Sequence, residues 1–191
     1  TKKTALIMAC PGVGEDQLRM VQGEASAMKA MFECKGWSVV VLSNAEPQAL
    51  LSDDVPQASA IIFLGHAGKT LGFHDAEGRW HTVSPEPITT ALAKKAHSAE
   101  LVILGGCHTW SLAEDLAGKG IQSVLCWKTA VDDDVAMFFH LHFLKQWLQE
   151  EAVIDAFDLA KTAVEGLDKS ARVDVFVSGG TLTCVPKYAL H

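Results

Sequence analysis

A histidine and a cysteine, His66 and Cys107, each follow a run of apolar residues and stand beside glycine. A cysteine attacks as its thiolate, which needs a base or cation nearby, and the leaving group needs a proton donor. Histidine meets both needs, because its unperturbed pKa is about 6.5. The small neighbouring residues would also let backbone N–H groups approach a substrate carbonyl and form an oxyanion hole. This pattern indicates a site for nucleophilic catalysis.

Each residue alone also has a structural interpretation. Cys107 could be a small buried apolar side chain, and His66 a loop histidine whose hydrogen bonds are satisfied. The repetition of the same arrangement after two apolar runs favours the catalytic interpretation. It requires that the two runs be neighbouring strands of one sheet, so that both side chains meet at the same end of it.

The apolar pattern predicts such a sheet. Six apolar runs are expected to be strands, at residues 4–9, 37–42, 60–64, 101–104, 121–127 and 173–177. Helical spacing of apolar residues predicts helices over residues 18–32, 88–96, 112–117, 135–148 and 153–167. Residues 71–82 alternate in character around Glu77-Gly78, which predicts a β-hairpin. Continuous apolar strands separated by helices are typical of an α/β fold: a mostly parallel sheet, here six-stranded, with helices on both faces.

Composition limits the function classes. The chain has 191 residues, 49% hydrophobic and 20% charged, which predicts a single globular domain over residues 1–191. A net charge of −7 gives no general attraction to nucleic acid or anionic lipid. The longest uncharged stretches, such as residues 55–68, are shorter than the roughly 18 residues that a membrane span needs. Neither nucleic acid nor a membrane is therefore an expected partner.

Cysteine usage predicts a reducing compartment. The five cysteines, an odd number, include no close C-x-x-C pair, and the pattern of a signal peptide is missing. We therefore expect a cytoplasmic protein without a disulfide framework or a zinc ribbon. The sequence begins at Thr1 rather than methionine, so a processed product and one domain of a longer protein with further attached domains both remain open.

In order and spacing, these segments together resemble the CHAT domain, a group of caspase-like, separase-related cysteine peptidases. The resemblance covers nearly the whole chain. In chain order, the matching features are the helix with Leu18, Glu24 and Ala25, the strand before His66, the hairpin of residues 71–82, the LVILGGC run that ends at Cys107, the Val131-Asp132-Asp133 segment and the helix with Ala136, Phe139 and Phe143. The resemblance implies a caspase-like fold.

The resemblance also implies a function. His66 and Cys107 would be the catalytic dyad of a cysteine endopeptidase, a thiol protease that hydrolyses protein or peptide substrates without a cofactor or metal. The backbone of Cys107 and of the Gly68 segment would supply the oxyanion hole. The family usually has glycine directly after its histidine, whereas this chain has Ala67, with Gly68 one place later. The alternative is therefore a catalytically latent caspase-like interaction or sensor module, against which the retained histidine and cysteine argue.

Three aspartates, Asp132 to Asp134, precede the predicted helix at residues 135–148. Capping and first-turn charge explain at least one of them. In the peptidases that the chain resembles, an acid from this region can line the pocket for the residue before the scissile bond. Asp132, and after it Asp133, would then bind substrate and select arginine or lysine there. Trp110, three residues after Cys107, is a further substrate-binding candidate, as a wall of the cleft.

Two other patterns suggest ligands but fit them poorly. Residues 65–70 read G-H-A-G-K-T, yet a phosphate-binding loop needs glycine where Phe63 stands. A hairpin pattern follows this loop instead of the helix that would hold the phosphate. His74 and His81 could face each other across the hairpin as a zinc pair, although an exposed pair without metal explains them as well. We therefore expect neither a nucleotide nor a metal.

Overall fold

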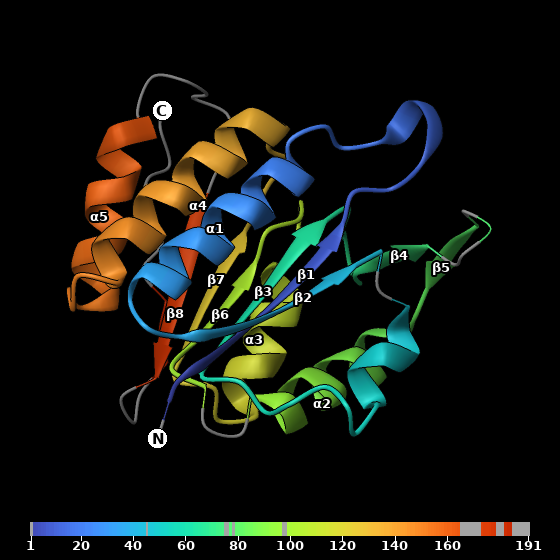
Figure 1. Cartoon of the computed structure of the whole chain (residues 1–191), viewed down its shortest axis with the longest axis horizontal. Coiled ribbons are helices and arrows are strands. Elements are labelled where there is room, and N and C mark those ends of the chain that lie inside the picture. Colours follow the sequence, from blue (N-terminus) through green and yellow to red (C-terminus); the bar gives the residue numbers. More distant parts are fainter. Residues whose placement is uncertain are drawn as a thin grey trace.

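The computed structural model describes residues 2–44, 46–74, 77, 79–96, 99–164, 173–178 and 182–184. Its centre is a seven-stranded sheet in the order β2-β1-β3-β6-β7-β8-β9 (Figure 1). The strands in this order are Ser38–Ser43, Thr4–Cys10, Ala60–Gly65, Leu101–Leu104, Ser123–Trp127, Val173–Ser178 and Leu182–Cys184. The first five are parallel, and β8 and β9 are antiparallel to their neighbours. The sheet thus contains the six predicted strands and one more, β9.

Helices cover both faces of the sheet, as the apolar pattern predicts. The helices α1 (Val21–Cys34), α4 (Asp133–Trp147) and α5 (Val153–Val164) pack on one face, whereas α2 (Pro85–Lys95) and α3 (Trp110–Gly118) pack on the other (Figure 1). Every residue of β3 is buried, with Ile61 and Phe63 facing α2 and α3, and Ile62 and Leu64 facing the other three helices. Burial on both faces explains the continuous apolar character of this strand.

The predicted helices and the hairpin are present, with shifted boundaries. Helix α1 begins at Val21, so Leu18 precedes it, and residues 165–167 of the last predicted helix lie outside the described residues. Strands β4 (Gly72–His74) and β5 (Trp80–Thr82) form the antiparallel hairpin. Two short 3-10 helices, Gly14–Asp16 and Pro47–Leu51, complete the described elements.

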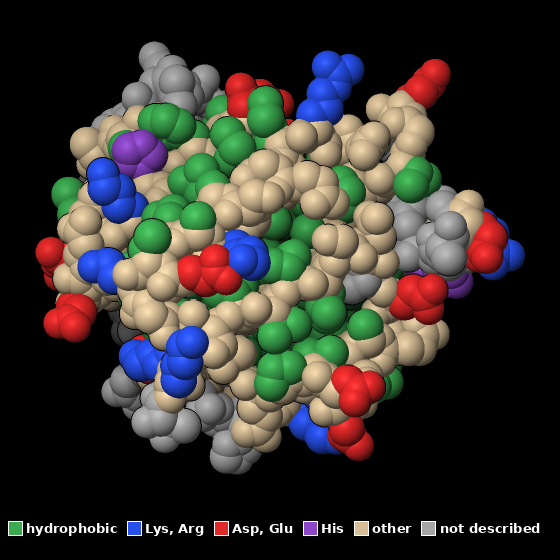
Figure 2. Space-filling view, viewed as in Figure 1, with side chains coloured by type: hydrophobic (Ala, Val, Ile, Leu, Met, Phe, Trp, Pro, Cys, Tyr) green, Lys and Arg blue, Asp and Glu red, His purple; other side chains and the backbone are tan. Residues whose placement is uncertain are grey.

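On the face shown in Figure 2, acidic and basic side chains are interspersed rather than gathered into a patch of one sign. No helix in the described part of the chain combines the length and the apolar character that crossing a bilayer requires.

Candidate functional site

The strands that precede His66 and Cys107 are neighbours. Strands β3 and β6 pair in parallel, with Phe63 opposite Leu104, and the Gly105 N–H donates a hydrogen bond to the Phe63 carbonyl at 2.7 Å. His66 and Cys107 each lie three residues beyond this last pair. The predicted adjacency is confirmed, and both residues follow the carboxyl end of the sheet, where ligands bind in open α/β sheets.

Gly106 brings the two segments into direct contact. A Cβ atom at Gly106 would lie 2.3 Å from the Cβ of Ala67, 2.6 Å from the carbonyl oxygen of Gly65 and 3.0 Å from the Ala67 nitrogen. Only a hydrogen atom fits there. The residue before Cys107 therefore packs against the residues on both sides of His66, and both candidate side chains are half-buried.

The sulfur of Cys107 lies against the backbone of the loop between β7 and α4. The Val131 N–H donates a hydrogen bond to Sγ at 3.4 Å, and the thiol lies 3.8 Å from the Val131 carbonyl, which can accept its proton. A thiolate would keep the first contact and lose the second. An N–H donor aimed at the sulfur stabilises the charged, nucleophilic form.

Thr109, a residue that the sequence analysis did not single out, holds the turn that carries Cys107. Its buried hydroxyl contacts the carbonyls of Leu104 at 3.3 Å and Gly106 at 3.1 Å. It also accepts a hydrogen bond from the Trp127 N–H at 3.1 Å, and the Thr109 N–H donates to the Trp127 carbonyl at 2.9 Å. The turn is thereby fixed between β6 and β7. In the sequence, Thr109 could have been noticed as a polar residue between an apolar strand and a predicted helix.

Hydrogen bonds around His66 bear on the oxyanion hole. The Gly68 N–H donates to the Thr70 carbonyl at 2.9 Å, and the Gly72 N–H donates to the His66 carbonyl at 2.9 Å. The Gly68 N–H, which was expected to hold the oxyanion, is therefore already bound to the Thr70 carbonyl. The Ala67 N–H, directly after His66, has no hydrogen-bond partner within the described ranges and lies beside Gly106.

The three aspartates have separate surroundings. Asp133 accepts a hydrogen bond from the Met20 N–H at 2.8 Å, which ties the start of α4 to the residue before α1. Asp134 accepts one from the Val135 N–H at 2.9 Å. Asp132 is the N-cap residue of α4, but its exposed carboxylate makes no capping hydrogen bond. It directly follows Val131, the residue in contact with the Cys107 sulfur.

Trp110 begins α3 and is half-buried beside the same loop. The ammonium nitrogen of Lys128 lies 3.7 Å from the centroid of its ring, a cation–π contact. The backbone of Lys128 also contacts His108, because the Lys128 carbonyl oxygen lies 3.3 Å from His108 Nδ1. The rim of the Cys107 turn thus presents an aromatic ring and a cation.

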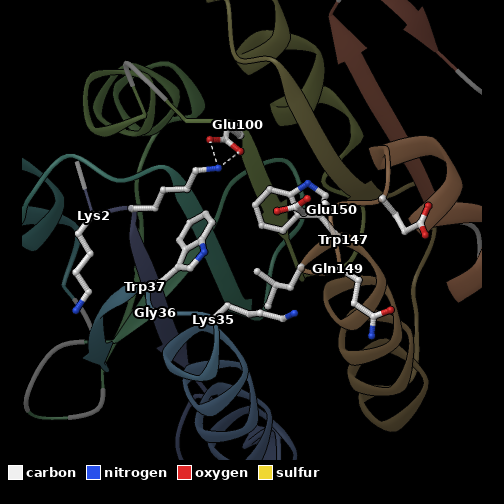
Figure 3. Close-up of a pocket in the computed structure, with 11 residues that line it drawn as sticks. Lys2, Lys35, Gly36, Trp37, Glu100, Trp147, Gln149 and Glu150 are labelled. Carbon is white, nitrogen blue, oxygen red and sulfur yellow. Dashed lines mark hydrogen bonds and ion pairs between the residues drawn. The ribbon is translucent and has the colours of Figure 1, made fainter.

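A cavity of about 720 Å³ lies elsewhere (Figure 3). Residues that precede β1, β2 and β6 line it, together with the end of α4, so it opens at the amino end of the sheet. Trp37 and Trp147 meet there at a centroid distance of 5.7 Å, and Lys3 pairs with Glu100 at 2.7 Å. Its position at the opposite end separates this cavity from His66 and Cys107.

Metal-binding geometry does not emerge from the described side chains. None of their histidines, cysteines, aspartates and glutamates form a group of three or more that could hold an ion. The hairpin register places His81 opposite Phe73 and His74 opposite Trp80, so the two histidines do not form a directly facing pair.

Three solved structures share the architecture. A secreted C11 cysteine protease from Bacteroides thetaiotaomicron has a TM-score of 0.63 at 7% identity, covering 93% of this chain and 66% of that one. The Arg-specific cysteine proteinase gingipain R has a TM-score of 0.60 at 12% identity, covering 87% of this chain and 43% of that one. The Drosophila initiator caspase Dronc has a TM-score of 0.54 at 9% identity, covering 90% of this chain and 78% of that one. At such identities these similarities establish the fold, which is caspase-like.

The sequence itself identifies the family. No curated protein matches the chain. The model of the CHAT domain, however, matches residues 2–173, a span that includes β3, β6 and both candidate catalytic residues. Together with the caspase-like fold, a match of this extent shows that the chain belongs to the CHAT domain family.

Proposed function

We propose that the chain is a cysteine endopeptidase in which Cys107 is the nucleophile and His66 the general acid and base. The CHAT family and the caspase-like fold support a cysteine peptidase. The observation that carries the proposal is the packing of Gly106 against Gly65 and Ala67, because it holds the histidine and cysteine segments together. The Val131 N–H at the sulfur supports the thiolate form.

The chemistry needs a protein or peptide substrate and no cofactor. The Cys107 thiolate forms a bond to the scissile carbonyl carbon, and the carbonyl electron pair moves onto oxygen. The backbone N–H groups of Ala67 and Cys107 hold the oxyanion, in place of the engaged Gly68 N–H. His66 gives its proton to the departing amine as the C–N bond breaks. Water then loses a proton to His66, attacks the thioester and releases the carboxylic acid and the thiolate.

Asp132 is the proposed determinant of specificity. Its neighbour Val131 contacts the nucleophile, so a substrate side chain close to the scissile bond passes near Asp132. The Asp132 carboxylate is exposed and makes no capping hydrogen bond to the helix, which leaves it available to a cationic side chain. A relative in fold, gingipain R, is named as Arg-specific, which agrees with a preference for arginine or lysine. Asp133 is the second candidate, because its carboxylate already binds the Met20 N–H.

Asp132→Asn should lower kcat/KM for peptides with arginine or lysine before the scissile bond by about a hundredfold. Peptides with a neutral residue there should be cleaved as before, because the substitution removes charge and keeps the shape. Asp134→Asn is the matched control, since it removes the same charge two residues further on and should leave the preference intact. A preference for basic residues that survives both Asp132→Asn and Asp133→Asn would return these aspartates to a purely structural role.

The reactivity of the thiols tests the proposal against a latent module. Cys107 should react with iodoacetamide faster than Cys34, although Cys34 is the more exposed of the two. We expect the faster reaction because His66 and the Val131 N–H would stabilise the thiolate, which is the form of Cys107 that attacks the reagent. Mass spectrometry of the alkylated peptides measures each rate, and a proteome-wide cleavage profile of the wild type beside Cys107→Ala identifies substrates. A Cys107 slower than Cys34, with no cleavage products, would favour the latent sensor.

A further inference from the structure

A buried polar network lies next to the Cys107 turn and has no part in the proposed chemistry. It joins His140 of α4, which is 0% exposed, with Glu24 of α1 and Trp127 of β7, both nearly as buried. The indole Nε1 of Trp127 donates a hydrogen bond to His140 Nε2 at 3.0 Å, and His140 Nδ1 lies 2.7 Å from a Glu24 carboxylate oxygen. Helices α1 and α4 lie side by side over this face of the sheet (Figure 1).

These partners determine the protonation of the imidazole. An indole N–H can only donate, so the Nε2 atom of His140 must accept and carries no proton. The single ring proton is therefore on Nδ1, where it is donated to Glu24. The two hydrogen bonds hold the His140 ring in one tautomer, and both of its ring nitrogens are used.

The same imidazole touches the segment that carries the nucleophile. A Cβ atom at Gly105, two residues before Cys107, would lie only 3.0 Å from His140 Cε1. A second connection runs through Trp127, whose indole binds His140 and whose backbone exchanges two hydrogen bonds with Thr109. The ring thus supports the turn directly at Gly105 and indirectly at Thr109, on both sides of Cys107.

We propose that His140 is a positioning residue for Cys107. Clamped between Glu24 and Trp127, it fixes the turn so that the sulfur meets the Val131 N–H and lies beside the His66 segment. The proposal rests on the proposed function for its effect on catalysis, whereas its effect on the Cys107 thiol is independent of any substrate. Because His140 is fully buried, it does not touch a substrate, so its loss should lower kcat and leave KM unchanged.

Variants of the two partners separate positioning from packing. Glu24→Leu removes the acceptor for the Nδ1 proton, and Trp127→Phe removes the indole donor while keeping an aromatic ring. Both substitutions should slow alkylation of Cys107 by at least about tenfold, because a displaced sulfur loses its N–H donor. The alkylation rate of Cys34 should stay unchanged. Glu24→Gln keeps an acceptor oxygen and should react at close to the wild-type rate. Phe32→Leu, a truncation of a buried ring that packs against Trp37 in the same core, controls for general loosening and should leave Cys107 unaffected.

Nitrogen-15 spectroscopy of the wild-type imidazole gives a readout that needs no variant. It should show His140 protonated at Nδ1 and unprotonated at Nε2, and a proton on Nε2 would overturn the proposal. Alkylation of Cys107 at the wild-type rate in Trp127→Phe would also overturn it, and this variant decides the matter if Glu24→Leu fails to fold. If the wild type cleaves no peptide yet Trp127→Phe slows alkylation, the proposed function is wrong and the positioning role stands.

Discussion

Cys107→Ala should abolish peptide cleavage, lowering kcat/KM by at least about a thousandfold, as expected for loss of a covalent nucleophile. The variant should unfold at nearly the wild-type temperature, because the half-buried thiol has only the backbone of Val131 as a hydrogen-bond partner in the described structure. Cleavage of the best substrate from a peptide library measures the first effect, and thermal denaturation measures the second.

Two further variants make this result specific. Cys34→Ala removes an exposed thiol and should leave cleavage unchanged. His66→Ala should be as severe as Cys107→Ala, and the double variant no worse than either single one, because residues that act as a unit give non-additive losses. Persistent cleavage in Cys107→Ala, together with a loss of several kcal/mol of stability on the scale of a core truncation, would make the cysteine structural.

Gly106→Ala should damage both stability and catalysis. The added methyl group would meet the Gly65 carbonyl oxygen at 2.6 Å and the Ala67 Cβ at 2.3 Å, so the two segments must separate. Overpacking of this kind lowers the free energy of unfolding by about 1–3 kcal/mol. Displacing Cys107 from His66 by even 1 Å should lower kcat/KM by about a hundredfold. Chemical denaturation and steady-state kinetics on the same preparation measure the two effects.

Gly118→Ala is the matched control for this substitution. Gly118 ends helix α3, and a Cβ atom there would meet no heavy atom within 4 Å. Alanine should leave cleavage unchanged and stabilise the helix by up to about 0.5–1 kcal/mol. Wild-type stability and activity in Gly106→Ala would show that the two segments do not touch, and would remove the main support for the dyad.

The fold was largely predictable because its strands are short apolar runs. Residues buried on both faces of a sheet leave continuous apolar stretches, and these gave the six strands and the adjacency of β3 and β6. The seventh strand, β9, is three residues long and lacks such a run. The antiparallel direction of β8 depends on the path of the chain between strands, which no local pattern encodes.

The surroundings of the candidate site were predictable only in part, because they too depend on how the chain folds. His66 and Cys107 stand out because each follows its own strand. The groups around them are recruited over long stretches of chain: Asp133 binds the backbone of Met20, and His140 binds Glu24. In the sequence, His140 is merely one of two histidines close together on a helix. The hydrogen bond that engages the Gly68 N–H likewise depends on a bridge that only the folded loop reveals.

The contact between Val131 and the Cys107 sulfur has an evolutionary consequence. The group that serves the sulfur is a main-chain N–H, which every amino acid except proline supplies. The side chains of this loop, including the exposed carboxylate of Asp132, therefore take no part in holding the sulfur. Under the proposed function, duplicated copies of such a gene could exchange residue 132 and diverge in substrate and biological role while keeping the same proposed nucleophile.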